Sequence, residues 1–124
     1  MPPRLFYGTL TVAAAADLGE ASFLDATRTA TGYRLFSLDG FPVLVEAPDD
    51  GAAIAVQVWE VPERQWAEIV ASEPAEMVSA DIELEDGRRV PTLVGSRSWV
   101  ESQGAADVTA YGSWAAYVRQ DDSP

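Results

Sequence analysis

The sequence predicts an α+β fold, in which a sheet curled toward a small mixed β-barrel carries one central helix and a short C-terminal helix. Three observations support this class. Short apolar runs bounded by turn residues dominate the chain, and only two segments have the spacing or the capping residues of a helix. The 124 residues, 48% of them hydrophobic, suffice for one domain with a sizeable core. We expect this domain over residues 1–120, followed by an acidic tail at 121–124.

The first half of the chain is predicted to consist of strands joined by turns. We expect strands over residues 4–10, 21–27, 33–38, 43–47 and 54–61. Turns are expected at Asp39-Gly40-Phe41-Pro42 and at Asp49-Asp50-Gly51. In the last of these strands the residues alternate between two faces. Ile54, Val56 and Val58 are expected on one face, and Gln57, Trp59 and Val61 on the other.

The clearest helix is predicted over residues 62–72. Pro62 stands where a first helical position belongs, and Pro74 prevents the helix from continuing. Three apolar residues share one face of this helix at spacings of three and four: Trp66, Ile69 and Val70.

The last third of the chain is predicted to form a hairpin followed by a short helix. Asp86-Gly87 is a strong turn signal between strands expected at 78–85 and 88–98. Thr109 is placed to cap the last helix, and that helix carries Trp114, which we expect in the core.

Four residue types are absent, and each absence removes a class of chemistry. The chain has no cysteine, histidine, lysine or asparagine, and its eight basic residues are all arginines. Zinc sites of the usual kind, thiolate nucleophiles, Ser-His relays and lysine Schiff bases are therefore excluded. We expect no metal and no cofactor. Carboxylates, hydroxyls, arginines and backbone amides remain for catalysis or binding.

The charge balance argues against two classes of partner. The formal net charge is −12 at pH 7, whereas binding to nucleic acid or to an anionic membrane needs clustered basic residues. No run of 18 apolar residues occurs, and the first residues lack a signal-peptide pattern. We therefore expect a cytoplasmic protein that binds neither nucleic acid nor membrane.

An anion-binding loop is predicted where the first strand meets a glycine. Apolar residues run directly into Gly8, which can adopt backbone angles that other residues avoid. Amide N–H groups that converge at such a turn can hold an anion without a basic side chain. The predicted loop consists of Tyr7, Gly8, Thr9 and Leu10.

Three stretches of sequence resemble a known superfamily. Phe6-Tyr7-Gly8-Thr9-Leu10 resembles the signature of the gamma-glutamylcyclotransferase-like superfamily. Tyr33-Arg34-Leu35-Phe36 and the run from Asp107-Val108-Thr109 to Tyr111-Gly112 are similar to the C-terminal domain of allophanate hydrolases, which has the same fold. The resemblance implies a small mixed barrel with a cavity lined by the glycine loop. The Ser-Ser-Lys amidase chemistry of allophanate hydrolase cannot occur here, because the chain has no lysine.

The resemblance also implies a catalytic carboxylate. In cyclotransferases of this superfamily, a glutamate that follows the helix after the middle strand removes a proton from the substrate's ammonium group, and Glu73 corresponds to it. At the C-terminal end of a helix, the dipole raises a carboxylate pKa. Glu73 could equally be a solvated surface acid, and Glu76 is an alternative base. Gln57 stands where relatives commonly carry a glutamate.

Three functional hypotheses follow. The first is a cyclotransferase-like enzyme acting on a small metabolite with amino and carboxylate groups, with Glu73 as base. The second is a non-catalytic domain that binds a small anion or a partner protein from a urea-type nitrogen pathway, and the third, related to it, is a pathway-specific activity on a carboxylated urea derivative. We expect Arg34 and Tyr111 to contribute to substrate binding beside the loop at 7–10. The expected partners are a small carboxylate-bearing metabolite and either a second copy of the chain or a pathway enzyme.

Overall fold

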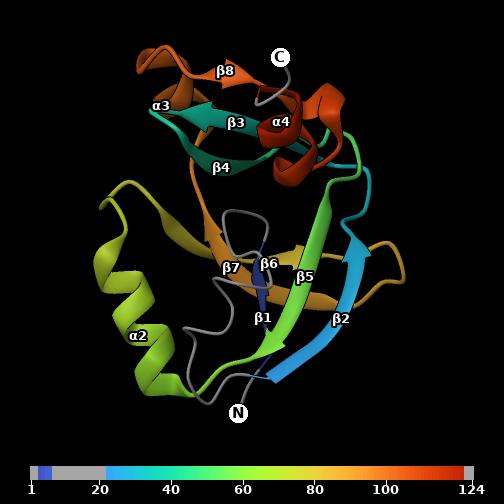
Figure 1. Ribbon diagram of the computed structural model, residues 1–124, viewed down its shortest axis with the longest axis vertical. Helices are drawn as coiled ribbons and strands as arrows, with labels where there is room; N and C mark the ends of the chain where they lie inside the picture. The colour runs from blue at the N-terminus through green and yellow to red at the C-terminus, as the bar shows by residue number, and fades with distance from the viewer. Residues whose placement is uncertain (1–2, 7–21, 122–124) are drawn as a thin grey trace.

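Figure 1 shows the computed structural model of the chain, which describes residues 3–6 and 22–121. The described residues form three sheets, and neighbouring strands within each sheet are antiparallel. One sheet has the order β1 (Pro3–Phe6), β5 (Ala55–Glu60) and β2 (Ser22–Arg28). The others are β4 (Phe41–Glu46), β3 (Tyr33–Leu38) and β8 (Ala106–Asp107), and the pair β6 (Val78–Glu83) and β7 (Arg89–Val94).

Isolated bridges connect the sheets where strands end. Thr29, which follows β2, pairs with Leu84, which follows β6. Val45 of β4 pairs in parallel with Gly95, which follows β7. Many strands with few helices confirm the predicted α+β class. The ladders of the described residues do not close into one ring, so the barrel stays a prediction.

The central helix matches its prediction closely. Helix α2 (Glu63–Ser72) begins after Pro62 and ends before Glu73. Trp66 packs against the core, whereas Val70, which was expected on the same face of the helix, is 39% exposed. Figure 1 shows α2 on one side of the molecule, at the level of β6 and β7.

The C-terminal third departs from the sequence prediction in three places. The strand expected over 88–98 ends at Val94, and helix α3 (Arg97–Ser102) follows it. Thr109 does not cap the last helix; it begins a single 3₁₀ turn, η2 (Thr109–Tyr111). Helix α4 (Trp114–Asp121) is instead capped by Ser113, whose Oγ accepts a hydrogen bond from the amide of Ala116 at 3.0 Å.

One further correction concerns the turn expected at residues 39–42. Only Asp39 and Gly40 form it, and both have positive φ angles of 50° and 87°. Phe41 and Pro42 belong to β4, paired with Leu38 and Ser37. A two-residue turn with both φ angles positive matches the twist of a hairpin, which explains why β4 begins at once.

Sheet β4–β3–β8 is covered on both faces by apolar residues. Leu35 and Leu44 belong to one buried cluster, which also includes Ile54, Val56 and Val58 of the neighbouring segment and Trp114 of α4. The second cluster lies on the other face and includes the following buried residues: Phe36, Leu38, Val43, Val45, Met77, Leu93 and Val100. Burial on both faces explains the unbroken apolar run Val43-Leu44-Val45.

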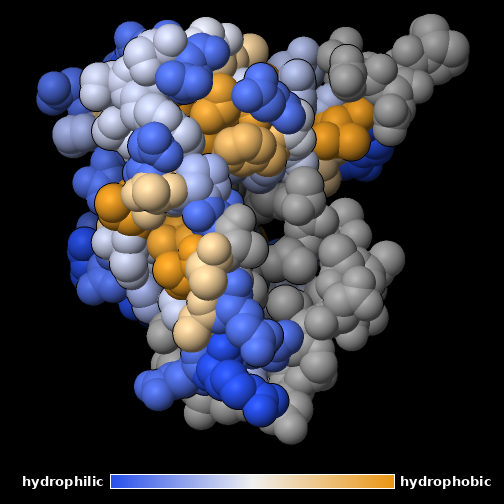
Figure 2. Space-filling model, turned by 90° about the vertical axis from the view of Figure 1, so that its left-hand side faces the viewer, coloured by the Kyte–Doolittle hydropathy of each residue, from blue (hydrophilic) through white to orange (hydrophobic). Residues whose placement is uncertain are grey.

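Some apolar side chains are exposed on the side of the molecule shown in Figure 2. Apolar side chains gather there in the upper and middle part of the face, while its lower end, where α2 begins, is hydrophilic. Trp66 and Trp99 are partly buried residues that border the second cluster. Among the described residues, no helix is both long and apolar enough to cross a membrane.

Candidate functional site

Glu73 leaves helix α2 as the following proline requires. Its φ and ψ angles are −91° and 157°, which is extended backbone, and its amide donates to the carbonyl of Val70 at 3.2 Å. Proline disfavours helical angles in the residue before it, so Pro74 explains this exit. The side chain is half-buried, and burial raises the pKa of the Glu73 carboxyl above its usual value. The carboxylate can therefore hold a proton at a higher pH than an exposed glutamate.

Two further predicted parts of the site are Glu76 and the loop at residues 7–10. Glu76, the alternative base, is exposed in the turn that follows, where the amide of Met77 donates to the carbonyl of Pro74 at 3.0 Å. Tyr7, Gly8, Thr9 and Leu10 lie outside the described residues, so the anion-binding loop stays a prediction.

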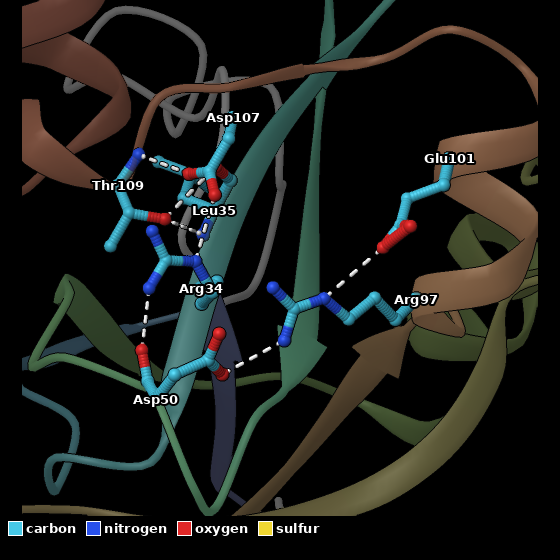
Figure 3. A network of polar contacts seen from close by, with 7 residues as sticks. All are labelled: Arg34, Leu35, Asp50, Arg97, Glu101, Asp107 and Thr109. Atoms are coloured by element: carbon cyan, nitrogen blue, oxygen red, sulfur yellow. Dashed lines mark hydrogen bonds and ion pairs between the residues drawn. The ribbon is translucent and has the colours of Figure 1, made fainter.

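Arg34 is held between two parts of the chain that are distant in sequence. Its Nε donates to Oδ2 of Asp107 at 2.8 Å, and its Nη1 donates to the backbone carbonyl of Asp50. Figure 3 shows the guanidinium between these two partners. Arg34 comes from β3, Asp107 from β8 and Asp50 from the turn after β4. Whether this arginine also binds a substrate carboxylate stays a prediction.

Asp107 is the centre of this arrangement. Its Oδ1 accepts the amide of Thr109 at 3.0 Å, while the hydroxyl of Thr109 accepts the amide of Leu35 at 2.9 Å. Burial alone would raise the pKa of Asp107, but the hydrogen bonds from Thr109 and Arg34 outweigh it and hold this pKa below its usual value. Asp107 therefore stays ionised beside Arg34 in mildly acidic solution.

A second arginine continues the network. Nη1 of Arg97 donates to Oδ1 of Asp50 at 2.8 Å, and its Nε donates to Oε1 of Glu101 at 3.2 Å (Figure 3). The hydrogen bond from Arg97 lowers the pKa of Asp50, and the same pairing raises the pKa of Arg97. Sequence reasoning did not find Arg97 as a partner of Asp50. The spacing of Arg97 and Glu101, four residues apart, would have indicated only their own pairing on a helix.

The aromatic residues near the C-terminus divide between core and surface. Trp114 is 5% exposed in the first core cluster, which confirms that it is a core residue. Tyr117 packs against that cluster and contacts the ring of Tyr111 edge-on, with centroids 5.2 Å apart. Tyr111 is 40% exposed, so its ring is accessible from solvent.

Gln57 projects from the other side of β5 than the buried Val56 and Val58. It is half-buried, and its Oε1 accepts a hydrogen bond from Nε1 of Trp59 at 3.1 Å. The amide therefore orients the indole of its neighbour on the same strand.

The predicted site residues fall into two groups. Glu73 follows α2, whereas Arg34 and Tyr111 lie on β3 and η2, in the part of the molecule formed by sheet β4–β3–β8 (Figure 1). The network through Asp107 and Thr109 connects Arg34 with the turn that carries Tyr111. Within residues 3–6 and 22–121, no group of three or more acidic side chains is arranged to hold a metal ion.

The sequence of this chain matches the profile of one known protein family. Residues 12–119 match the sequence profile of the allophanate hydrolase C-terminal domain. The urea amidolyase of Lachancea kluyveri is 25% identical over 104 residues, which covers 79% of this chain and 6% of that protein. The chain thus spans only a small part of the curated relative that it resembles.

Solved structures show the same fold. A protein specific to uropathogenic E. coli has a TM-score of 0.79 and 28% identity, with 95% of this chain and 97% of that chain covered. Kluyveromyces lactis allophanate hydrolase has a TM-score of 0.83 and 22% identity, with 98% of this chain but 21% of that chain covered. Together with the profile match over residues 12–119, these likenesses lead to one conclusion: the chain belongs to the family of allophanate hydrolase C-terminal domains.

Proposed function

We propose that the chain binds a small carboxylated urea derivative such as allophanate, as an accessory domain of urea nitrogen metabolism. The observation that carries this proposal is the family match over residues 12–119, because relatives with this domain are named for urea and allophanate. The matching segment is 6% of the urea amidolyase and 21% of the allophanate hydrolase. Only binding by this domain is therefore proposed, with a pathway enzyme or a second copy as its protein partner.

Arg34 is the proposed contact for the ligand's carboxylate. The chain has no lysine, so a charged contact to a carboxylate must come from one of its eight arginines. Arg34 is held in place by Asp107 and by the carbonyl of Asp50, and its side chain keeps 25% of its surface exposed. Tyr111 and the backbone of residues 7–10 are proposed to complete the site.

Titration calorimetry with allophanate tests this proposal. We expect saturable binding that is about 10- to 100-fold tighter for allophanate than for biuret, in which a neutral amide replaces the carboxylate, because hydrogen bonds to charged groups are worth about 1.5–3 kcal/mol. Arg34→Gln should remove this preference. Arg64→Gln is the matched control, since Arg64 is exposed on α2. Equal affinity for both ligands, or no binding of either, would refute the proposal.

A second candidate function rests on Glu73. Its exit from α2, its partial burial and its raised pKa are the properties that a general base needs. We propose a cyclotransferase-like reaction as the alternative. The Glu73 carboxylate takes one proton from the substrate's α-ammonium, and the free amine attacks the γ-carbonyl in the same molecule. The protonated carboxyl then gives that proton to the nitrogen of the departing amine as its bond to the γ-carbon breaks. The attacking nitrogen loses its second proton to the released amine, so the products are 5-oxoproline, with a neutral lactam N–H, and an ammonium ion.

Release of 5-oxoproline from a panel of gamma-glutamyl amides tests the alternative. Glu73→Gln should lower turnover by about 10²–10⁴-fold, the usual contribution of a general base, while the protein stays folded. Glu68→Gln, an exposed glutamate of α2, should leave turnover unchanged. Loss of turnover in Glu76→Gln instead would assign the base to Glu76. Absence of 5-oxoproline from the parent protein with the whole panel would reject this candidate.

A further inference from the structure

We propose that Asp107 is a positioning residue, which holds the guanidinium of Arg34 so that its remaining N–H groups are presented to a small carboxylate. The proposal deepens the binding function above and rests on it. It assigns no direct ligand contact to Asp107. The carboxylate acts on the ligand only through the arginine that it orients.

The contacts of Arg34 leave part of its guanidinium available. A guanidinium has five N–H donors in a rigid planar fork. Two are used within the described residues: Nε–H donates to Oδ2 of Asp107 at 2.8 Å, and one N–H of Nη1 donates to the carbonyl of Asp50. Because both contacts are made by groups on the backbone or close to it, they fix the plane of the fork. The remaining three donors are suited to a planar carboxylate.

Asp107 can orient Arg34 because Asp107 itself is fixed. The backbone of Asp107 pairs with Phe36 in the short antiparallel ladder between β3 and β8. Its second carboxylate oxygen accepts the amide of Thr109 at 3.0 Å, and the hydroxyl of Thr109 accepts the amide of Leu35 at 2.9 Å. One carboxylate therefore connects β3, which carries Arg34, with η2, which ends at Tyr111.

The neighbouring charges support the same arrangement. The nearby carboxylate of Asp50 is hydrogen-bonded to Arg97, and Arg97 also pairs with Glu101. Nη1 of Arg34 thus donates to the neutral backbone carbonyl of Asp50. Within the described residues, Asp107 is the one carboxylate that forms an ion pair with Arg34. Figure 3 shows Asp107 and Asp50 on different sides of the Arg34 guanidinium.

Asp107→Asn tests the proposal, with Asp86→Asn as the matched control. Asparagine can still accept the amide of Thr109, but its NH₂ group would face the Nε–H of Arg34, donor against donor. Asp86 makes the same two kinds of contact locally, to the amide of Arg88 at 3.0 Å and to its Nε at 2.8 Å. Both variants thus lose one charge and one arginine contact, at different places.

The first readout needs no ligand. A ¹H–¹⁵N spectrum resolves the Nε–H groups of the eight arginines, and the signal that is lost in Arg34→Lys belongs to Arg34. The Nε proton of Arg34 should exchange slowly with water. Asp107→Asn should abolish this protection, and Asp86→Asn should affect only Arg88. Slow exchange that persists in Asp107→Asn, or fast exchange in the parent, would overturn the proposal.

The second readout is affinity for allophanate. Asp107→Asn should weaken binding about two- to tenfold, the usual effect of having to immobilise a freed side chain, whereas Asp86→Asn should not. Unchanged affinity together with lost protection would overturn the proposal. If the parent binds no carboxylate, the binding function fails, and the spectrum alone shows whether Asp107 orients Arg34. Asp107→Glu, which keeps the charge but moves the carboxylate by one methylene, is the second variant if asparagine prevents folding.

Discussion

Gly51 lies where two neighbouring backbone segments approach it closely. A Cβ atom at this position would meet the amide nitrogen of Tyr33 and would lie 2.5 Å from the carbonyl oxygen of Ala47 and 2.5 Å from the carbonyl carbon of Gly32. All three are backbone atoms, so no side-chain rotation can relieve the overlap. The turn after β4 packs this tightly because Ala52 and Tyr33 exchange backbone hydrogen bonds at 2.7 and 3.3 Å.

We expect Gly51→Ala to destabilise the protein by at least about 1–3 kcal/mol, the usual cost of overpacking. Gly32→Ala is the control, because a Cβ there meets nothing within 4 Å, and its effect should stay within about 0.5 kcal/mol. Urea unfolding of both variants measures the difference. Equal stability of the two variants would show that the chain relaxes around Gly51.

At the scale of elements, helix α3 shows how a capping serine starts a helix directly after a strand. The apolar run of β7 stops at Val94, and Ser96 follows as the N-cap with extended backbone. Its Oγ accepts the amide of Trp99 at 3.1 Å, and Val100 is fully buried in the second core cluster. A helix of six residues is too short to be stable alone, so the cap and this packing maintain it.

We predict that Ser96→Ala lowers the free energy of unfolding by about 0.5–2 kcal/mol, the usual range for loss of an N-cap. Ser79→Ala, at an exposed position of β6, should have little effect. Hydrogen exchange of the Trp99 amide should become faster in Ser96→Ala and stay unchanged in Ser79→Ala. Unaltered exchange at Trp99 would contradict a capping role for Ser96.

For the whole molecule, pH is expected to change stability through a few acidic groups. The pKa values of Asp50, Asp86 and Asp107 lie below their usual value in the folded protein. Each ionised carboxylate therefore stabilises the fold above its unfolded pKa of about 3.9, and this contribution is lost as pH falls through the lower folded value. Glu73 has the opposite sign, since its raised pKa stabilises the fold only while the group is protonated.

We expect the free energy of unfolding to fall as pH decreases from about 4 toward 2, with a shallower decrease in Asp107→Asn than in the parent. Glu73→Gln should be at least as stable as the parent at pH 7, because it removes a half-buried charge. Urea unfolding at a series of pH values from about 2 to 7 measures both effects. A parallel decrease in the parent and in Asp107→Asn would contradict the lowered pKa of Asp107.

Some elements of the fold could be predicted from the sequence, and others could not. The strand over Tyr33–Leu38, the central helix and the core position of Trp114 could be predicted, because periodicity and proline placement act over a few residues. Helix α3 was missed because its sequence is compatible with a continued strand. The Ser113 cap was missed because Thr109 is also a suitable capping residue. Packing against the core decided between these alternatives.

The sequence alone determined the class of fold, the family, the absence of lysine, histidine and cysteine chemistry, and the exit of Glu73 from its helix, because these depend on composition or on adjacent residues. Only the tertiary structure decided the partners of Arg34. Asp107 lies 73 residues away in sequence and Asp50 lies 16 away, and no local pattern connects them. Sheet pairing between β3 and β8 brings Asp107 beside Arg34, so the candidate ligand contact and the residue that orients it exist only in the folded chain.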